Sequence, residues 1–282
     1  MPTPTHKTIA LSSINVQVAE WGREGKPPLI LLHGLASTHH MFDLIAPALA
    51  QDWHVYTFDQ RGHGLSDKPN TGYDFEQIAS DIDELIDVLD IEQPLRMLGH
   101  SWGGYTALYY AATRPEKIAK AVLLDGGTLR FRDRFQDWEQ ANIAMSPPRY
   151  HNQNLDHIKH MIRESWLGEA FRPEIEPLAL SIFDLSNPDD VRARLNRENH
   201  MQIARSIWAF EPGDYYPKIQ CPLLIVYAQS DDPNDYARQQ TSAQRAKDGV
   251  SDVEIVWMPN TIHDIPWHKP DELVRVLVSF LV

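Results

Sequence analysis

Short apolar runs alternate along this chain with longer stretches in which apolar residues recur at helical spacing. Seven runs are typical of strands, and an eighth strand is expected near Lys7–Leu11: the seven are Ile14–Glu20, Leu29–His33, His54–Asp59, Leu95–His100, Ala119–Asp125, Leu223–Ala228 and Val253–Met258. A helical stripe passes through Ile78, Ile82, Leu85, Ile86 and Leu89, and a last helix is expected to begin at Pro270. The alternation predicts the α/β class, with a mostly parallel, eight-stranded sheet flanked by helices.

One interval breaks this alternation. Residues 128–217 contain no convincing strand, although an α/β connection ordinarily takes only about a dozen residues. The interval has helical patterns of its own, as at Leu155, Ile158 and Ile162, and many aromatic residues. We interpret it as a helical cap inserted into a core domain of residues 1–127 and 218–282. The cap is expected to cover an apolar, largely closed pocket, with most of its rings in its own core.

Composition and charge exclude several classes of partner. The 282 residues carry a net charge of −13 and no basic run, which argues against nucleic acid as a partner. Cys221 is the single cysteine, so no internal disulfide forms and a reducing compartment is expected. No signal-peptide pattern and no stretch of about 20 apolar residues occurs. We expect a cytoplasmic protein, monomeric or homodimeric, without membrane or nucleic-acid partners.

The sequence Gly99-His100-Ser101-Trp102-Gly103 lies between a strand-like run and a helix-like run. A G-x-S-x-G pattern in that context predicts a nucleophile elbow, in which a sharp strand-to-helix turn exposes the serine hydroxyl. The alternative is an ordinary glycine-rich turn, because so short a pattern also arises by chance. The flanking strand and helix patterns favour the elbow, and Ser101 is the candidate nucleophile.

A serine hydroxyl needs a base, and the base needs a carboxylate that orients it. His263 follows the last predicted strand and is the candidate base, whereas His268 is interpreted as structural. For the acid, Asp231 ranks first, in the loop after Leu223–Ala228. Asp232 ranks second, because it precedes a proline and suits a turn. Asp125, at an earlier strand end, is the third option.

The oxyanion of an acyl-transfer reaction needs backbone N–H donors. One donor is expected from Trp102, directly after the nucleophile, and the other from Leu35, in the loop after Leu29–His33. His33 is interpreted as a residue that orders this loop. His100 adjoins Ser101 on the turn, and its side chain is expected to point away from the hydroxyl.

Four motifs in order resemble the α/β-hydrolase superfamily: His33-Gly34, the stretch from Phe58 to Asp67, the elbow Gly99–Gly103 and the late His263. The resemblance covers the predicted core and leaves the cap unmatched. It implies an α/β-hydrolase fold and a serine carboxylesterase-like enzyme. Haloalkane dehalogenases and soluble epoxide hydrolases carry aspartate in place of Ser101, so those activities are disfavoured.

The predicted activity is cleavage of small to medium carboxylic esters through an acyl-enzyme, without cofactor or metal. Amidase or aminopeptidase, lactonase and C–C bond hydrolase activities would use the same triad and stay open, as does a ligand receptor on the same fold. Prolyl iminopeptidases share a tryptophan after the serine, but their Gly-Gly-Pro-Gly loop is absent here. His157 and His160, with Glu164, could be drawn as metal ligands, but they lack a fourth partner at a recognisable spacing.

Overall fold

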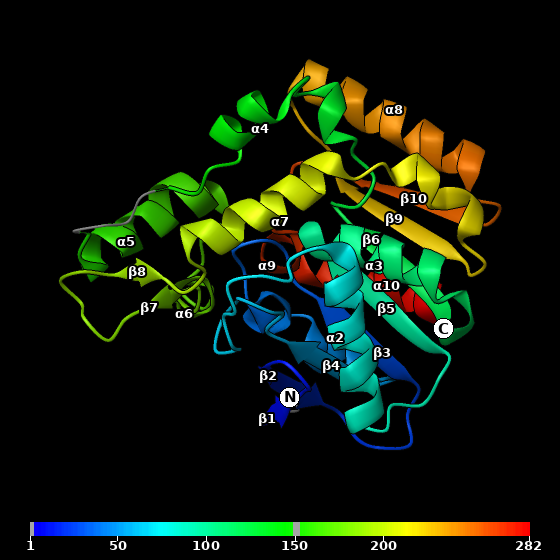
Figure 1. The fold of residues 1–282 in the computed structure, drawn as a ribbon, viewed down its shortest axis with the longest axis horizontal. Helices are drawn as coiled ribbons and strands as arrows, with labels where there is room; N and C mark the ends of the chain where they lie inside the picture. Colours follow the sequence, from blue (N-terminus) through cyan, green and yellow to red (C-terminus); the bar gives the residue numbers. More distant parts are fainter. Residues whose placement is uncertain (1–2, 149–152) are drawn as a thin grey trace.

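The computed structural model describes residues 3–148 and 153–282. Its central sheet has eight strands in the order β1-β2-β4-β3-β5-β6-β9-β10, which confirms the predicted α/β class and strand number (Figure 1). The strands are β1 (Thr5–Ala10), β2 (Asn15–Trp21), β3 (Pro28–Leu32), β4 (His54–Phe58), β5 (Leu95–His100), β6 (Ile118–Leu124), β9 (Leu223–Ala228) and β10 (Val253–Met258). Pairing is antiparallel from β1 to β4 and parallel from there to β10.

Helices cover both faces of the sheet because its central strands are buried on both sides. In β3, Ile30 and Leu32 pack into one hydrophobic cluster, and Leu29 and Leu31 pack into the other. The first cluster includes residues of α2 (Phe75–Val88), α3 (Trp102–Thr113) and α8 (Pro233–Gly249). The second includes residues of α1 (Ala46–Leu49), α9 (Ile265–His268) and α10 (Pro270–Leu281). The predicted helices at residues 78–89 and from Pro270 correspond to α2 and α10.

Parallel pairing brings the functional candidates to one edge of the sheet. The neighbouring strands β5, β6, β9 and β10 all run in one direction, so their carboxyl ends lie together. Ser101 follows β5 directly and Asp125 follows β6, while His263 lies in the loop after β10. Residues far apart in the sequence therefore become neighbours at this edge.

The segment between β6 and β9 contains the additional helices (green to yellow in Figure 1). Its elements include α4 (Trp138–Ala144), α5 (Leu155–Met161), a π-helical turn (Ile162–Leu167), α6 (Glu176–Leu180) and α7 (Arg197–Ala209). Strands β7 (Phe183–Asp184) and β8 (Arg192–Ala193) pair here, a two-residue ladder that the sequence pattern did not predict. Figure 1 shows α5, α6, β7 and β8 gathered at one end of the molecule, with α7 running from there toward α8. Within the described residues, no helix is long and apolar enough to span a membrane.

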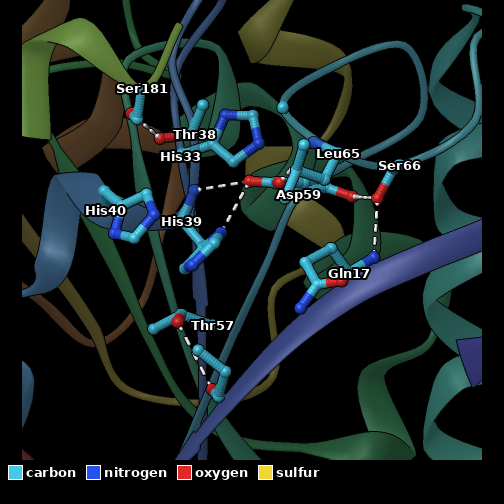
Figure 2. A network of polar contacts seen from close by, with 12 residues as sticks. Gln17, His33, Thr38, His39, His40, Thr57, Asp59, Leu65, Ser66 and Ser181 are labelled. Carbon is cyan, nitrogen blue, oxygen red and sulfur yellow. Dashed lines mark hydrogen bonds and ion pairs between the residues drawn. The ribbon is translucent and has the colours of Figure 1, made fainter. Parts of the chain in front are cut away.

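Asp59, directly after β4, is the centre of a buried polar network (Figure 2). One carboxylate oxygen accepts hydrogen bonds from the backbone N–H and the ring Nδ1 of His39, at 2.9 and 2.8 Å. The other accepts from the Leu65 N–H at 2.8 Å. Burial alone would raise the pKa of Asp59, but the hydrogen bonds and charge of His39 outweigh it and hold that pKa far below its usual range. The network ties the stretch Phe58–Asp67 to His39, in the segment that follows β3.

We expect Asp59→Asn to lower the free energy of unfolding by about 3 kcal/mol, because an amide nitrogen would face a buried donor. A carboxylate whose pKa is depressed by folding stabilises the protein above its unfolded pKa near about 4, and that contribution is lost as pH falls. Urea unfolding of wild type and variant should therefore differ most at neutral pH and converge in acid. Asp67→Asn, at an exposed carboxylate, is the matched control and should cost less than about 1 kcal/mol.

Candidate active site

Ser101 occupies a strained turn between β5 and α3. Its backbone angles, φ 54° and ψ −118°, are a conformation that side-chain-bearing residues adopt only when their surroundings impose it. Both flanking glycines are sterically required. A Cβ on Gly99 would lie 1.9 Å from the Gly103 carbonyl oxygen, and one on Gly103 would lie 2.2 Å from that of Leu32. The G-x-S-x-G pattern therefore has the geometry of a nucleophile elbow.

Two backbone donors lie next to this elbow. Trp102 is the first residue of α3, so its N–H has no partner within the helix. Leu35 lies in the turn after β3, and among the described residues nothing accepts a hydrogen bond from its N–H. Gly34 brings that turn against the serine, since a Cβ on Gly34 would lie 2.9 Å from the Ser101 Cβ. The structure thus places both predicted oxyanion donors beside Ser101.

Two buried histidines hold the loop after β3, which contains Leu35, in place. His33 Nε2 accepts from the Gln60 N–H at 3.0 Å, so its Nδ1 carries the proton and donates to the Gly34 carbonyl at 2.8 Å. In the same way, His63 Nε2 accepts from the Ala36 N–H at 3.2 Å. Burial lowers the pKa of His33 to about 4 and that of His63 well below its usual value. Both rings are therefore neutral and order the loop through hydrogen bonds, which is the role expected for His33.

His63 is a residue whose position the sequence reasoning did not use. Its ring also stacks on the Trp102 indole, with centroids 5.2 Å apart and planes at 23°. It therefore links the two predicted oxyanion donors, one through Ala36 and the other through the indole. The sequence signal was present in the stretch Phe58–Asp67, but that stretch alone does not show what His63 contacts.

His263 is hydrogen-bonded to Asp125. Its Nδ1 lies 2.5 Å from Asp125 Oδ2, and Asp125 Oδ1 accepts from the Ala228 N–H at 3.0 Å. The Asp125 side chain is 12% exposed and that of His263 is 52% exposed. A carboxylate fixed by a backbone donor on one oxygen and by the imidazole on the other holds the ring in one tautomer. Among the described residues no hydrogen bond involves His263 Nε2, so that nitrogen can accept a proton.

This contact corrects the ranking of the acids. Asp231 was expected to orient His263, but it is exposed in the loop after β9 and the histidine bonds to Asp125 instead. Asp232 caps α8 by accepting from the N–H groups of Asn234 and Asp235, so it serves the turn as expected. The physical reason that Asp125 reaches His263 is its backbone conformation. Its φ of 45° turns the chain directly after β6, while its N–H donates to the Val226 carbonyl of β9 at 2.7 Å.

His100 and His268 support the loop that carries His263. His100 Nε2 donates to the His263 carbonyl at 3.0 Å. Burial and the charge of His263 lower the pKa of His100 to about 4, so this ring is neutral and occupied as a donor. His268 Nδ1 accepts from the Ile262 N–H at 3.2 Å. Neither ring is placed as the base.

The pKa of His263 is raised to about 9. Desolvation lowers it, but the hydrogen bond and charge of Asp125 and the charge of Asp264 outweigh that effect. A base must be neutral to accept a proton, so kcat/KM should rise with pH and reach half its maximum above about pH 6.5, the usual histidine value. A pH–rate profile on a soluble ester measures this midpoint.

The same shift can be measured without turnover. In a Ser101→Ala background, NMR titration of the His263 ring should give a pKa above the usual value, and adding Asp125→Asn should lower it. Equal titration curves in the two proteins would contradict the assigned contact.

Two cavities meet at His263. One, of about 240 Å³, is lined by Ser101 and His263 with several apolar side chains, among them Leu35, Met41, Trp166 and Ile182. The other, of about 730 Å³, is lined by Asp125 and His263 together with many polar or charged side chains, including Arg130, Asp133, Arg134, Asp231, Asp235 and Arg238. The expected apolar, aromatic pocket is matched only in part, because both cavities mix apolar with polar side chains. Each has one aromatic residue from the interval 128–217, Trp166 in the smaller cavity and Phe131 in the larger.

The metal-site interpretation of His157 and His160, which the sequence already disfavoured, has no geometric support in the described part of the chain. No group of three or more His, Cys, Asp or Glu side chains there is arranged to hold a metal ion. His157 and His160 are exposed on α5.

Comparison with known families agrees with this geometry. The alpha/beta hydrolase fold family matches residues 27–256. The chain therefore belongs to the alpha/beta hydrolase fold family, as its motifs indicated.

Curated relatives match over shorter segments. The soluble epoxide hydrolase of Corynebacterium sp. (strain C12) is 37% identical over 98 residues, covering 35% of this chain and 34% of that protein. The 2-(acetamidomethylene)succinate hydrolase of Mesorhizobium japonicum (strain LMG 29417 / CECT 9101 / MAFF 303099) is 33% identical over 119 residues, covering 42% of each. The chain thus spans only about a third to a half of the length of these relatives.

Among solved structures, E-2-(acetamidomethylene)succinate hydrolase superposes with a TM-score of 0.80 at 23% identity. The match covers 99% of both chains. At that identity the likeness concerns the fold, and it includes the interval 128–217.

Proposed function

We propose that this protein is a serine hydrolase that cleaves carboxylic esters of small to medium size through an acyl-enzyme intermediate. The observation that carries the proposal is the constellation at the sheet edge. Ser101 lies on a strained elbow and shares a cavity with His263, which is hydrogen-bonded to Asp125. Nucleophile, base and orienting acid are the three parts that such a reaction requires.

In the proposed reaction, Ser101 Oγ attacks the acyl carbon while His263 Nε2 takes the hydroxyl proton. The N–H groups of Trp102 and Leu35 stabilise the developing oxyanion. His263 then gives its proton to the departing alcohol, which leaves Ser101 acylated. A water molecule attacks the acyl carbon with His263 again as base, and the acid is released with free Ser101.

The residues 128–217 are proposed to act as a cap over this site. Trp166 from that interval lines the cavity of Ser101 together with Ile182. Thr38 precedes the short helical turn His39–Phe42, and its hydroxyl oxygen lies 2.6 Å from that of Ser181 in the interval 128–217 (Figure 2). An apolar wall of this kind favours small acyl groups and excludes water from the oxyanion.

A second candidate is hydrolysis of an N-acyl compound by the same residues. It is favoured by the Mesorhizobium japonicum relative, whose name describes the hydrolysis of an acetamido compound. The epoxide hydrolase likeness carries less weight, because epoxide hydrolases resembling this fold use aspartate where this chain has Ser101.

A substrate panel tests the proposal. It should include p-nitrophenyl acetate and butyrate, p-nitroacetanilide, a simple lactone and an emulsified long-chain triglyceride. We expect repeated turnover of the short esters, faster than of the anilide, and no rate jump when the triglyceride forms droplets. One slow modification per molecule would instead indicate a ligand-binding protein on this fold, and a steep rise at the interface would indicate a lipase.

A further inference from the structure

The loop that carries His263 is attached to the interval 128–217 by two side chains. Trp166 Nε1 donates to Asp264 Oδ2 at 2.8 Å, directly beside the proposed base. Arg172 donates to the main-chain oxygens of Trp267 and His268, the latter at 3.3 Å. Both contacts join residues about a hundred positions apart in the sequence. They attach α9 and the preceding residue Asp264 to the interval 128–217.

We propose that Trp166 and Arg172 form a clamp that positions His263 for catalysis, so that the cap sets the geometry of the triad as well as the shape of the pocket. The inference rests on the proposed function, in which His263 is the base. Trp166 and Arg172 are positioning residues, since they act through Asp264 and α9.

The setting of Trp166 supports this role. It lies in the π-helical turn Ile162–Leu167, a rare conformation that occurs frequently at functional sites. Its ring packs on Trp267 of α9, with centroids 5.6 Å apart. The indole has one polar atom, and Asp264 occupies it. The ring can therefore line the Ser101 cavity with apolar surface while its edge fixes the histidine loop.

The loop is also held from the core. His100, one residue before the nucleophile, donates to the His263 carbonyl and lies 3.9 Å from Asp264 Oδ1. The main-chain carbonyl of Asp264 accepts from the N–H groups of Trp267 and His268, which ties the loop to the first turn of α9. His263 is thus fixed between a core contact and a cap contact. Without the hydrogen bond from Trp166, the Asp264 carboxylate can move, and the His263 imidazole is expected to move away from Ser101 with it.

Two variants test the clamp. Trp166→Phe keeps an aromatic ring in the cavity but removes the donor to Asp264. Arg172→Gln removes the second attachment without changing a residue that lines the Ser101 cavity. Trp208→Phe is the matched control for the first, because it deletes an indole hydrogen bond to Phe135 within the cap. Arg163→Gln is the control for the second, since Arg163 pairs with Glu176.

We expect kcat to fall by about ten- to a hundredfold in each clamp variant, the cost of a displacement of about 1 Å at a reacting group. KM should change by less than about threefold. Hydrogen exchange of the backbone amides of residues 263–269 should speed up by at least about tenfold. Both control variants should match wild type in all three measurements.

The exchange measurement does not depend on turnover, so the two proposals can fail separately. Full activity of Ser101→Ala would remove the serine mechanism, while exchange would still decide whether the clamp holds the loop. Unchanged exchange in both clamp variants would overturn the clamp. Faster exchange with wild-type kcat would show that the clamp stabilises the loop without positioning the base.

Discussion

Ser101→Ala should abolish turnover of every ester that the wild-type protein cleaves, with kcat reduced by at least about a thousandfold. The hydroxyl is the proposed nucleophile, and no other side chain on the elbow can replace it. Steady-state kinetics on p-nitrophenyl butyrate measure the loss. Since the hydroxyl makes no side-chain hydrogen bond to the start of α3 and the methyl group keeps the elbow's shape, the melting temperature should stay close to that of wild type.

A covalent probe makes the same prediction site-specific. A fluorophosphonate should label wild-type protein at Ser101 alone, and peptide mass mapping should find the adduct there. Ser37 is a useful control, because it lines the same cavity without the elbow geometry, and Ser37→Ala should retain labelling. Labelling of Ser101→Ala at wild-type rate, or activity within about tenfold of wild type, would rule out the serine mechanism.

The fold was predictable because its signals are local. Most strands of the central sheet are short apolar runs, and the stripe of α2 repeats every three or four residues, so neighbouring side chains alone indicate these elements. The elbow was predictable for a related reason. The glycines around Ser101 meet the backbone of Gly103 and Leu32 so closely that no larger residue fits, and that requirement leaves a pattern in the sequence.

The partners of His263 were not predictable in this way. Asp125 and His263 are 138 positions apart, and Trp166 and Asp264 are 98 apart. Two loops at the same sheet edge offer a carboxylate after a strand, and the sequence cannot show which of them the histidine loop reaches. The choice depends on the backbone turn at Asp125 and on the direction in which the loop after β9 leaves the sheet.

The aromatic residues that line the pocket were not predictable either. An interval rich in aromatic residues predicts an aromatic lining, but most of those rings pack against each other. Trp138 packs near Trp208, with ring centroids 5.8 Å apart. Phe210 stacks on Tyr215 at 4.6 Å and also packs on Phe75 of α2 at 4.7 Å. Burying a ring against its neighbours in this way gains as much apolar contact as facing a ligand. Composition therefore indicates a cap with a core, and tertiary structure decides which ring reaches the site.

Asp125→Asn should reduce kcat by about ten thousandfold at neutral pH, the second of the two largest effects. The amide can present its nitrogen to His263 Nδ1, which favours the tautomer with the proton on Nε2, and that nitrogen can then no longer take the proton of Ser101. The substitution also removes the carboxylate charge that stabilises the His263 imidazolium in the transition state. Asp231→Asn is the matched control, because Asp231 lines the larger cavity with Asp125 but does not bond to His263.

The control should leave kcat within about threefold of wild type. Circular dichroism and melting temperature of both variants separate loss of chemistry from loss of fold. The reverse pattern, a damaging Asp231→Asn and a mild Asp125→Asn, would mean that the histidine loop changes partner when substrate binds. In that case the acid would lie after β9, and the 2.5 Å contact between His263 and Asp125 would belong to the resting protein only.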